Sequence, residues 1–312
     1  MKTPTFLFIP LLILLLSGCA NSPEPQELPN IETLEPKKSE SAEQDNRVNS
    51  DDTDKSDTKY NTINISDSIT EEIDLSDKFG GIKGCAVIYD PANDKYSVYN
   101  TSLCEQEASP YSTFKIISTL AGLNNGVIQT EQSTMNYSGE KYPSSEWNDD
   151  LSLEKAFQTS CIWYFRQIID EVGHDEIQSE LISLEYGNCD ISEWDGSGIN
   201  PMPDLNGFWL GASLKISPLE QVQVLKKIFE GESLYSAEDV ALLKEIMLVS
   251  EDTKRIYGKT GSGPDGEAWF VGFAEENGER IYFAIYLNDN TQANNVSGNT
   301  AKEIALDVLE SF

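Results

Sequence analysis

The chain has 312 residues, of which 39% are hydrophobic and 10% aromatic, which is enough apolar material for one sizeable globular domain. Its 22 basic and 53 acidic residues give a formal net charge of −31. A chain this acidic repels the phosphate backbone of nucleic acids, and its sequence shows no basic stripe. We therefore predict that it does not bind nucleic acid.

The N-terminal residues are predicted to be a targeting segment. An apolar run extends from Phe6 to Leu16, which is too short for a transmembrane span of about 20 residues, so we expect a signal peptide over residues 1–18. The run ends in Leu-Ser-Gly-Cys19, which resembles a bacterial lipobox. The alternative is a plain secretory signal with an incidental cysteine. We predict lipidation of Cys19 and a lipid anchor that holds the protein on the bacterial cell membrane, outside the cytoplasm.

Residues 19–60 are predicted to form a disordered acidic tether. They contain several prolines and an excess of acidic residues, and they lack Phe and Trp. Such a composition cannot bury enough apolar surface to offset the entropy cost of folding. Residues 61–312 are predicted to form the folded domain, which carries a net charge of −26 and is itself acidic.

The first elements of this domain are a hairpin and a buried helix. Residues 84–90 and 95–100 are apolar or alternating, and they flank the turn sequence Pro-Ala-Asn-Asp. Residues 114–123 are apolar on nearly every side, which predicts a buried helix, and the sequence Asn-Asn-Gly at 124–126 ends it.

The later elements are helices followed by strands. We expect two helical segments within residues 153–172, on either side of Ser160, and an amphipathic helix at 217–229 opened by proline. Three strands and a closing helix follow, at 255–261, 268–274, 280–287 and 300–312, with an Asn-Gly turn between the last two strands. This order predicts an α+β fold in which helices flank an antiparallel sheet.

Several kinds of site are disfavoured. The one histidine, His174, lies in a polar stretch far from any nucleophile motif, which disfavours a Ser-His-Asp triad. Neither His-Glu-x-x-His nor Cys-x-x-Cys occurs, so we predict no metal site. Cys85 and Cys104 flank the early hairpin, and a disulfide and free thiols both remain open for them and for Cys161 and Cys189.

The pattern Ser-x-x-Lys occurs four times, beginning at Ser56, Ser112, Ser138 and Ser152. The first lies in the predicted tether and is discarded. The pattern that starts at Ser112 stands where the buried helix begins and ends in Lys115. A serine nucleophile without histidine needs another base, and lysine is the usual substitute.

A second motif, Lys259-Thr260-Gly261, lies on the first of the late strands. Ser-x-x-Lys followed by Lys-Thr-Gly is the signature of penicillin-binding proteins and serine β-lactamases. Three further motifs lie between these two: Ser160-Cys-Ile162, Tyr186-Gly-Asn188 and Phe208-Trp-Leu210.

Together the motifs resemble the class D (oxacillinase-type) serine β-lactamases, from about Gly84 to the C-terminus. The resemblance implies the β-lactamase/transpeptidase-like fold with a mostly helical subdomain, and hydrolysis of β-lactam antibiotics. It assigns no catalytic position to Ser138 or Ser152.

The resemblance also implies four catalytic residues. Ser112 attacks the lactam carbonyl and becomes acylated. Lys115, converted by CO2 to N6-carboxylysine, activates Ser112 and later the hydrolytic water; no other cofactor is implied. Ser160 relays a proton towards the leaving nitrogen, and Lys259 supports that relay.

The remaining implied residues bind the substrate or enclose the site. Thr260 and Lys259 contact the substrate carboxylate, and Gly261 allows the backbone to approach closely. The backbone N–H groups of Ser112 and Ser262 form the oxyanion hole. Trp209 hydrogen-bonds the carboxylated lysine, and Ile162 shields it.

Two positions depart from the family pattern. Ile162 replaces a valine, which adds one methylene. Class D enzymes usually carry an arginine near the C-terminal helix for the substrate carboxylate, and this chain has no arginine after Arg280. Lys302 stands close to that place and is our candidate for the same contact, with single-point geometry.

Two other functions share these motifs. One is a β-lactam sensor, which is acylated without efficient deacylation; known sensors carry several membrane helices and an intracellular protease domain, which this chain lacks. The other is a peptidoglycan DD-peptidase, which usually has larger or extra domains. We expect the hydrolase, while oligomeric state and β-lactam spectrum stay open.

Overall fold

The structure is a computed structural model, and it describes residues 68–251, 254–292 and 296–312. The predicted signal peptide, Cys19 and the predicted tether lie outside the described residues. Among the helices that are described, none combines the length and the apolar character needed to cross a bilayer.

In the described part of the chain, seven strands form one sheet in the order β1-β3-β2-β7-β6-β5-β4. The strands are β1 (Ile69–Glu72), β2 (Gly84–Asp90), β3 (Lys95–Tyr99), β4 (Leu248–Glu251), β5 (Arg255–Ser262), β6 (Glu267–Glu276) and β7 (Glu279–Asn288). Every neighbouring pair is antiparallel except β1 with β3, which is parallel. The predicted antiparallel sheet is therefore confirmed for its hairpin and meander, and the unpredicted β1 makes the whole sheet mixed.

The helices cover the two faces of this sheet or lie together beside it. They are α1 (Ser76–Phe79), α2 (Thr101–Cys104), α3 (Lys115–Asn124), α4 (Leu153–Gln158), α5 (Ile162–Val172), α6 (His174–Leu184), α7 (Pro218–Phe229), α8 (Ala237–Ile246) and α9 (Gly298–Leu309). Short 3-10 helices are η1 (Tyr111–Phe114), η2 (Ser145–Trp147), η3 (Pro203–Leu205) and η4 (Asn290–Gln292).

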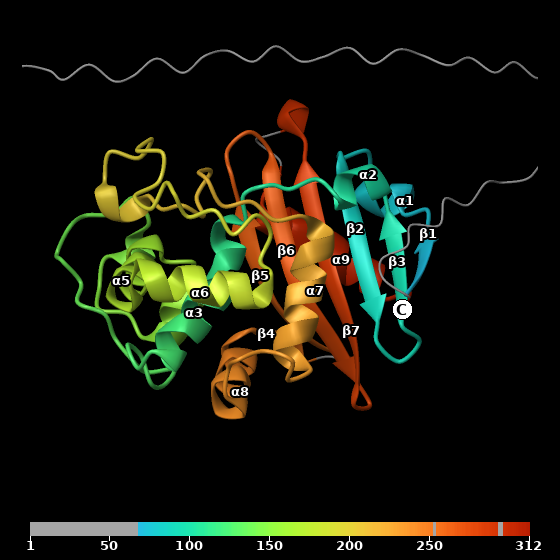
Figure 1. Cartoon of the computed structure of the whole chain (residues 1–312). Helices are drawn as coiled ribbons and strands as arrows, with labels where there is room; N and C mark the ends of the chain where they lie inside the picture. The colour runs from blue at the N-terminus through green and yellow to red at the C-terminus, as the bar shows by residue number, and fades with distance from the viewer. Residues whose placement is uncertain (1–67, 252–253, 293–295) are drawn as a thin grey trace, which may run out of the picture. The chain divides into compact units, whose positions relative to one another are not determined.

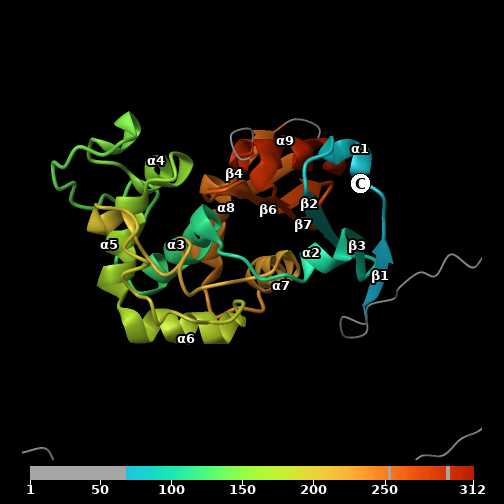
Figure 2. The same cartoon turned by 90° about the horizontal axis from the view of Figure 1, so that it is seen from above.

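Two apolar cores follow from the strand periodicity. Alternate residues of β2 point to opposite faces, so Val87 belongs to one core and Ala86 to the other. Helices α9 and α1 cover the face that contains Ala86, whereas α7 and α2 cover the opposite face (Figure 2). Helices α3, α5 and α6 lie together beside the sheet and form the helical subdomain that the family resemblance implies (Figure 1).

The turn between β6 and β7 confirms the strongest hairpin signal in the sequence. Asn277 and Gly278 both have positive φ, 54° and 88°, as a two-residue hairpin turn with right-handed strand twist requires. The early hairpin is confirmed as well, because β2 and β3 pair across the predicted turn.

The buried helix differs from its prediction at one end. Residues 111–114 form the 3-10 helix η1, and α3 begins only at Lys115. Ser112 therefore lies in a tight turn that precedes the α-helix. The interior of α3 is buried as predicted, and a Cβ at Gly122 would lie 2.8 Å from Ile168 Cγ2, so glycine lets α3 pack closely against α5.

The four cysteines in the described part of the chain are free thiols, namely Cys85, Cys104, Cys161 and Cys189. Of the two alternatives left open for Cys85 and Cys104, the structure has the unbridged one.

Candidate active site

Four parts of the fold supply the polar side chains that the sequence singled out. η1 carries Ser112, and α3 begins with Lys115. The turn between α4 and α5 carries Ser160, whose φ of 55° is uncommon for a residue with a Cβ. Strand β5 carries Lys259, and it packs against η1.

Ser112 and Lys115 form the first polar pair. Lys115 Nζ donates to Ser112 Oγ at 2.9 Å, because the i, i+3 spacing sets the two side chains one helical turn apart. Lys115 is fully buried, with its Nζ 5.4 Å from the centroid of the Phe165 ring. Burial lowers the pKa of Lys115 to about 7. At neutral pH about half of these amines are uncharged and able to take a proton from the serine hydroxyl.

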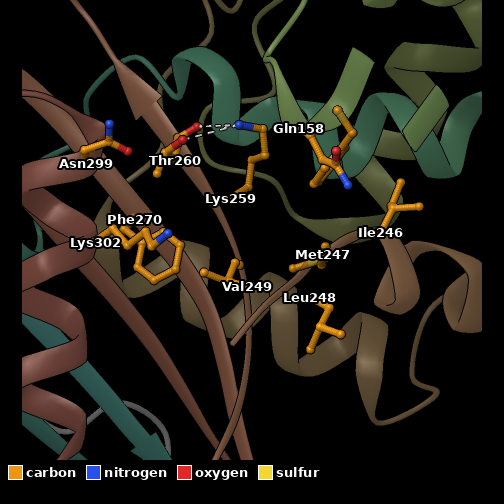
Figure 3. Close-up of a pocket in the computed structure, with 12 residues that line it drawn as sticks. Gln158, Ile246, Met247, Leu248, Val249, Lys259, Thr260, Phe270, Asn299 and Lys302 are labelled. Carbon is orange, nitrogen blue, oxygen red and sulfur yellow. Dashed lines mark hydrogen bonds between the residues drawn. The ribbon is translucent and has the colours of Figure 1, made fainter. Parts of the chain in front are cut away.

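Ser160 and Lys259 form the second polar pair. Lys259 Nζ donates to Ser160 Oγ at 2.5 Å and to Thr260 Oγ1 at 3.4 Å; Figure 3 shows Lys259 directed at Thr260. Burial, and next the positive charge of Lys115, lower the pKa of Lys259 well below its usual range. The two lysines are therefore close enough to interact electrostatically, so the two polar pairs belong to one site.

Cys161 lies beside this site, but its chemistry differs from that of Ser112. It is fully buried, and burial raises the pKa of its thiol to about 12. The thiolate is the reactive form of cysteine, so at neutral pH this residue is a poor nucleophile.

Gly261 and Ser262 connect β5 to the neighbouring elements. A Cβ at Gly261 would lie 3.1 Å from Pro110 O and 3.2 Å from Thr113 Cγ2, so the absence of a side chain lets β5 approach η1. The Ser262 hydroxyl accepts from Gly298 N at 2.9 Å, at the start of α9. The Ser262 side chain is thus engaged with α9, which leaves its backbone N–H as its candidate contribution to an oxyanion hole.

Trp209 is fully buried and stacks against Phe114, the residue before Lys115, at a centroid distance of 5.7 Å. Within the described part of the chain, its Nε1 has no hydrogen-bond partner. Such a buried N–H is costly, and an acceptor oxygen on the Lys115 amine is the kind of group that would satisfy it. Ile162, half-buried, opens α5 two residues after Ser160.

A pocket of about 290 Å³ extends from Lys259 and Thr260 along the β5 edge (Figure 3). Lys302 and Asn299, one turn apart on α9, line its wall with Gln158. The structure thus brings Lys302 to the pocket that contains the Lys-Thr-Gly residues. Asn299 and Gln158 belong to no motif and were not predicted from the sequence. Asn299 could have been found, because it lies three residues before Lys302 and so on the same face of the C-terminal helix.

The serines that the family pattern excluded have ordinary structural roles. Ser152 Oγ accepts from Lys155 N at 3.3 Å and caps α4, while Lys155 Nζ pairs with Glu146. Ser138 Oγ accepts from Glu140 N. His174 is exposed and lies beside Asp175. Across the residues that the structure describes, no group of His, Cys, Asp and Glu could hold a metal ion.

The motif that supplies Tyr186, Gly187 and Asn188 forms a wall behind η1. A Cβ at Gly187 would lie 1.9 Å from Lys215 O, so only glycine fits there. Asn188 Oδ1 accepts from Lys215 N at 3.0 Å, and the Tyr186 ring packs edge-on against Phe114 at 5.6 Å.

Residues 84–310 match the family model described as penicillin binding protein transpeptidase domain. The chain is 34% identical over 239 residues to the Regulatory protein BlaR1 of Bacillus licheniformis, covering 75% of this chain and 37% of that protein. It is 32% identical over 244 residues to the probable beta-lactamase YbxI of Bacillus subtilis, covering 77% of this chain and 85% of that protein. The crystal structure of a class D beta-lactamase from Bacillus subtilis matches with a TM-score of 0.68 and 32% identity, over 77% of this chain and 95% of that one.

Proposed function

Because the chain belongs to the penicillin-binding protein transpeptidase family, with class D β-lactamases and sensor proteins among its relatives, we propose that it hydrolyses β-lactam antibiotics through an acyl-enzyme on Ser112. The observation that carries the proposal is the hydrogen-bonded pair of Ser112 with a fully buried Lys115, next to the pair of Ser160 with Lys259. A structural role alone does not call for two buried lysines whose pKa values are both lowered.

Acylation begins with the Ser112 hydroxyl. In this step the carboxylated form of Lys115 would take the hydroxyl proton while Ser112 Oγ bonds to the lactam carbonyl carbon. The carbonyl oxygen becomes an oxyanion that the backbone N–H groups of Ser112 and Ser262 stabilise. When the C–N bond of the lactam breaks, the nitrogen takes a proton from Ser160 Oγ, and Lys259, which donates to that oxygen at 2.5 Å, replaces it.

The carboxylate of the antibiotic is proposed to bind at the pocket along β5. Lys259 and Thr260 supply hydrogen-bond donors at its inner end, and Lys302 supplies a cation. Within the described residues Lys302 makes no ion pair, so its charge is available to a ligand. A lysine offers a point charge, in contrast to the bidentate contact of an arginine.

Carboxylation of Lys115 by CO2, as the family resemblance implies, is part of the proposal. The carboxylated amine would supply a general base for Ser112 and for the water that hydrolyses the ester. Burial favours it, because CO2 adds only to the uncharged amine. The unpartnered indole N–H of Trp209 is suited to hold the added oxygens, and Ile162 is suited to keep bulk water away.

A β-lactam sensor is the second candidate, because the chain is also 34% identical to the Regulatory protein BlaR1 of Bacillus licheniformis. The match spans only 37% of that protein's length, so its role as a whole stays a proposal for this chain. A sensor needs acylation without efficient hydrolysis. The peptidoglycan DD-peptidase is a further outcome, and it requires release of D-alanine from a D-alanyl-D-alanine peptide.

The direct test is an absorbance assay of the full chain with benzylpenicillin in bicarbonate buffer. We expect loss of the lactam absorbance in large molar excess over protein. Opening of only one lactam per protein molecule would favour the sensor. No reaction with the lactam would contradict both candidates.

The location of the protein is proposed from its sequence. Cleavage before Cys19 and lipidation of that cysteine would anchor the chain outside the cytoplasm, where β-lactams arrive from the environment.

A further inference from the structure

Tyr111 directly precedes the candidate nucleophile and has an uncommon backbone conformation. Its φ is +48°, in the left-handed region that bulky L residues rarely adopt. Such a conformation persists only where surrounding contacts hold it, and it is a reason to look for a functional cause.

The contacts of Tyr111 hold it at both ends. Its backbone N donates to Trp209 O at 3.0 Å, and its phenol O–H donates to Glu267 Oε2 at 2.5 Å. The other carboxylate oxygen of Glu267 accepts from the Tyr286 hydroxyl at 3.3 Å, which fixes the carboxylate. The Tyr111 side chain is 5% exposed, and burial followed by the contact with Glu267 raises its pKa, so the phenol remains a donor.

The same side chain contacts the turn between β5 and β6 a second time. A Cβ at Gly263 would lie 2.3 Å from Tyr111 Cζ, so the ring occupies the place of a side chain there. Gly263 N donates to Glu267 O at 2.8 Å and closes the turn. The ring and the hydroxyl of Tyr111 therefore join the turn that carries the nucleophile to the turn that ends β5.

We propose that Tyr111 and Glu267 are positioning residues that fix the spacing between the two halves of the oxyanion hole. Ser112 follows Tyr111, and Ser262 precedes Gly263, which the Tyr111 ring contacts. Each N–H donor is therefore one residue away from a residue that takes part in these contacts. Donors stabilise an oxyanion only when both lie about 2.7–3.1 Å from it. This inference rests on the proposed function. Tyr111 and Glu267 would serve that function although they belong to none of the motifs.

The test compares Tyr111→Phe, which keeps the ring and loses the hydrogen bond, with the wild-type full chain. Acylation and deacylation both pass through an oxyanion, so we expect both rate constants for benzylpenicillin to fall roughly 10-fold, less than the 10²–10³ seen when a donor is removed. The affinity for phenylboronic acid, whose tetrahedral adduct with Ser112 places an oxygen in the hole, should fall by a similar factor. A purely structural role would lower the melting temperature and leave these three quantities in place.

Variants of Glu267, which accepts the hydrogen bond of Tyr111, test the same proposal. Glu267→Ala should match Tyr111→Phe, and Glu267→Gln, which keeps an acceptor oxygen, should recover most of the loss. Tyr286→Phe is the matched control, since it removes the other phenol bound to Glu267, and we expect changes below about threefold in the rate constants.

Two results would overturn the inference. In the first, Tyr111→Phe and Glu267→Ala both keep acylation, deacylation and boronate affinity within about twofold of wild type. In the second, only one of the two chemical steps slows. Failure of the proposed function is recognised separately in the wild-type protein, which would then either not be acylated on Ser112 or keep the acyl group.

Discussion

Lys115 is the residue whose chemistry depends most on its surroundings. An exposed lysine has a pKa near 10.4 and is almost entirely charged at pH 7. Burial brings the pKa of Lys115 to about 7, so the uncharged amine becomes abundant where Ser112 needs a base. The sequence identified this lysine among four Ser-x-x-Lys patterns only through its neighbours, because burial is not visible in the pattern itself.

At the residue scale, the first prediction separates the nucleophile from a structural serine of the same pattern. Ser112→Ala should reduce penicillin hydrolysis by roughly 10⁶, as for serine nucleophiles generally. Ser152→Ala removes a helix cap and should cost about 1 kcal/mol of unfolding free energy while hydrolysis persists. Hydrolysis rates and urea unfolding measure the two effects. A folded but inactive Ser152→Ala protein would show that the motif is misassigned.

The second prediction concerns the carboxylation of Lys115. The uncharged fraction of the Lys115 amine decreases as the pH drops below the pKa of about 7. At pH 6 this fraction is roughly one tenth. In CO2-depleted buffer at pH 6 we expect activity to fall and bicarbonate to restore it, and Trp209→Phe should increase that dependence because the indole N–H is lost.

The measurement that does not depend on activity is a carbon NMR spectrum with labelled bicarbonate. A carbamate signal should appear in the wild-type protein and be missing from Lys115→Ala. If the two spectra agree, Lys115 is not carboxylated.

At the element scale, α9 and β5 together shape the proposed carboxylate pocket. The N-terminal turns of α9 bring Asn299 and Lys302 beside Thr260, while Ser262 binds the first residue of the helix. The third prediction follows from this arrangement.

Lys302→Ala should raise KM for benzylpenicillin more than it lowers kcat, because a cation that binds the carboxylate contributes equally to the ground state and the transition state. Lys83→Ala, a lysine on which no site role is placed, serves as the control. Steady-state kinetics measure both. An unchanged KM in Lys302→Ala would assign the carboxylate to Lys259 and Thr260 alone.

Elements with a strong local signal could be predicted from the sequence. The Asn277-Gly278 turn and the apolar strands beside it fix the meander, and Pro218 marks the start of α7. Strand β1 could not be predicted, since Ile-Thr-Glu-Glu at an exposed sheet edge has no apolar face to mark it. The 3-10 turn at Ser112 was also missed, because its φ values depend on contacts with Trp209 and Glu267 from distant parts of the chain.

Some residues of the candidate site could be predicted from the sequence and others could not. Ser112, Lys115, Ser160 and Lys259 stand in motifs, and the structure brings them together as two hydrogen-bonded pairs. Tyr111 and Glu267 are 156 positions apart and meet only through the packing of β6 against η1, so no local pattern could link them.

At the scale of the whole molecule, the net charge of −31 favours solubility and disfavours approach to anionic surfaces. A stable association with a membrane would therefore depend on the lipid anchor. This follows from the sequence and concerns residues outside those that the structure describes.

The fourth prediction tests the anchor. The wild-type protein should fractionate with membranes of a bacterial host, and Cys19→Ser should move it to the soluble or uncleaved fraction. Immunoblots of the fractions, with mass spectrometry of the mature N-terminus, measure this. A soluble wild-type protein with an unmodified Cys19 would contradict the lipobox interpretation.

The proposed reaction requires Ser112 to form an acyl-enzyme that the protein then hydrolyses. Its most direct test is intact-mass spectrometry of the full chain mixed with benzylpenicillin, followed over time, with peptide mapping of the modified residue. We expect an adduct of one penicillin on Ser112 that appears quickly and disappears as the antibiotic is consumed. A lasting adduct on Ser112 would contradict the hydrolase and support a sensor, and an adduct on any other residue would contradict the site.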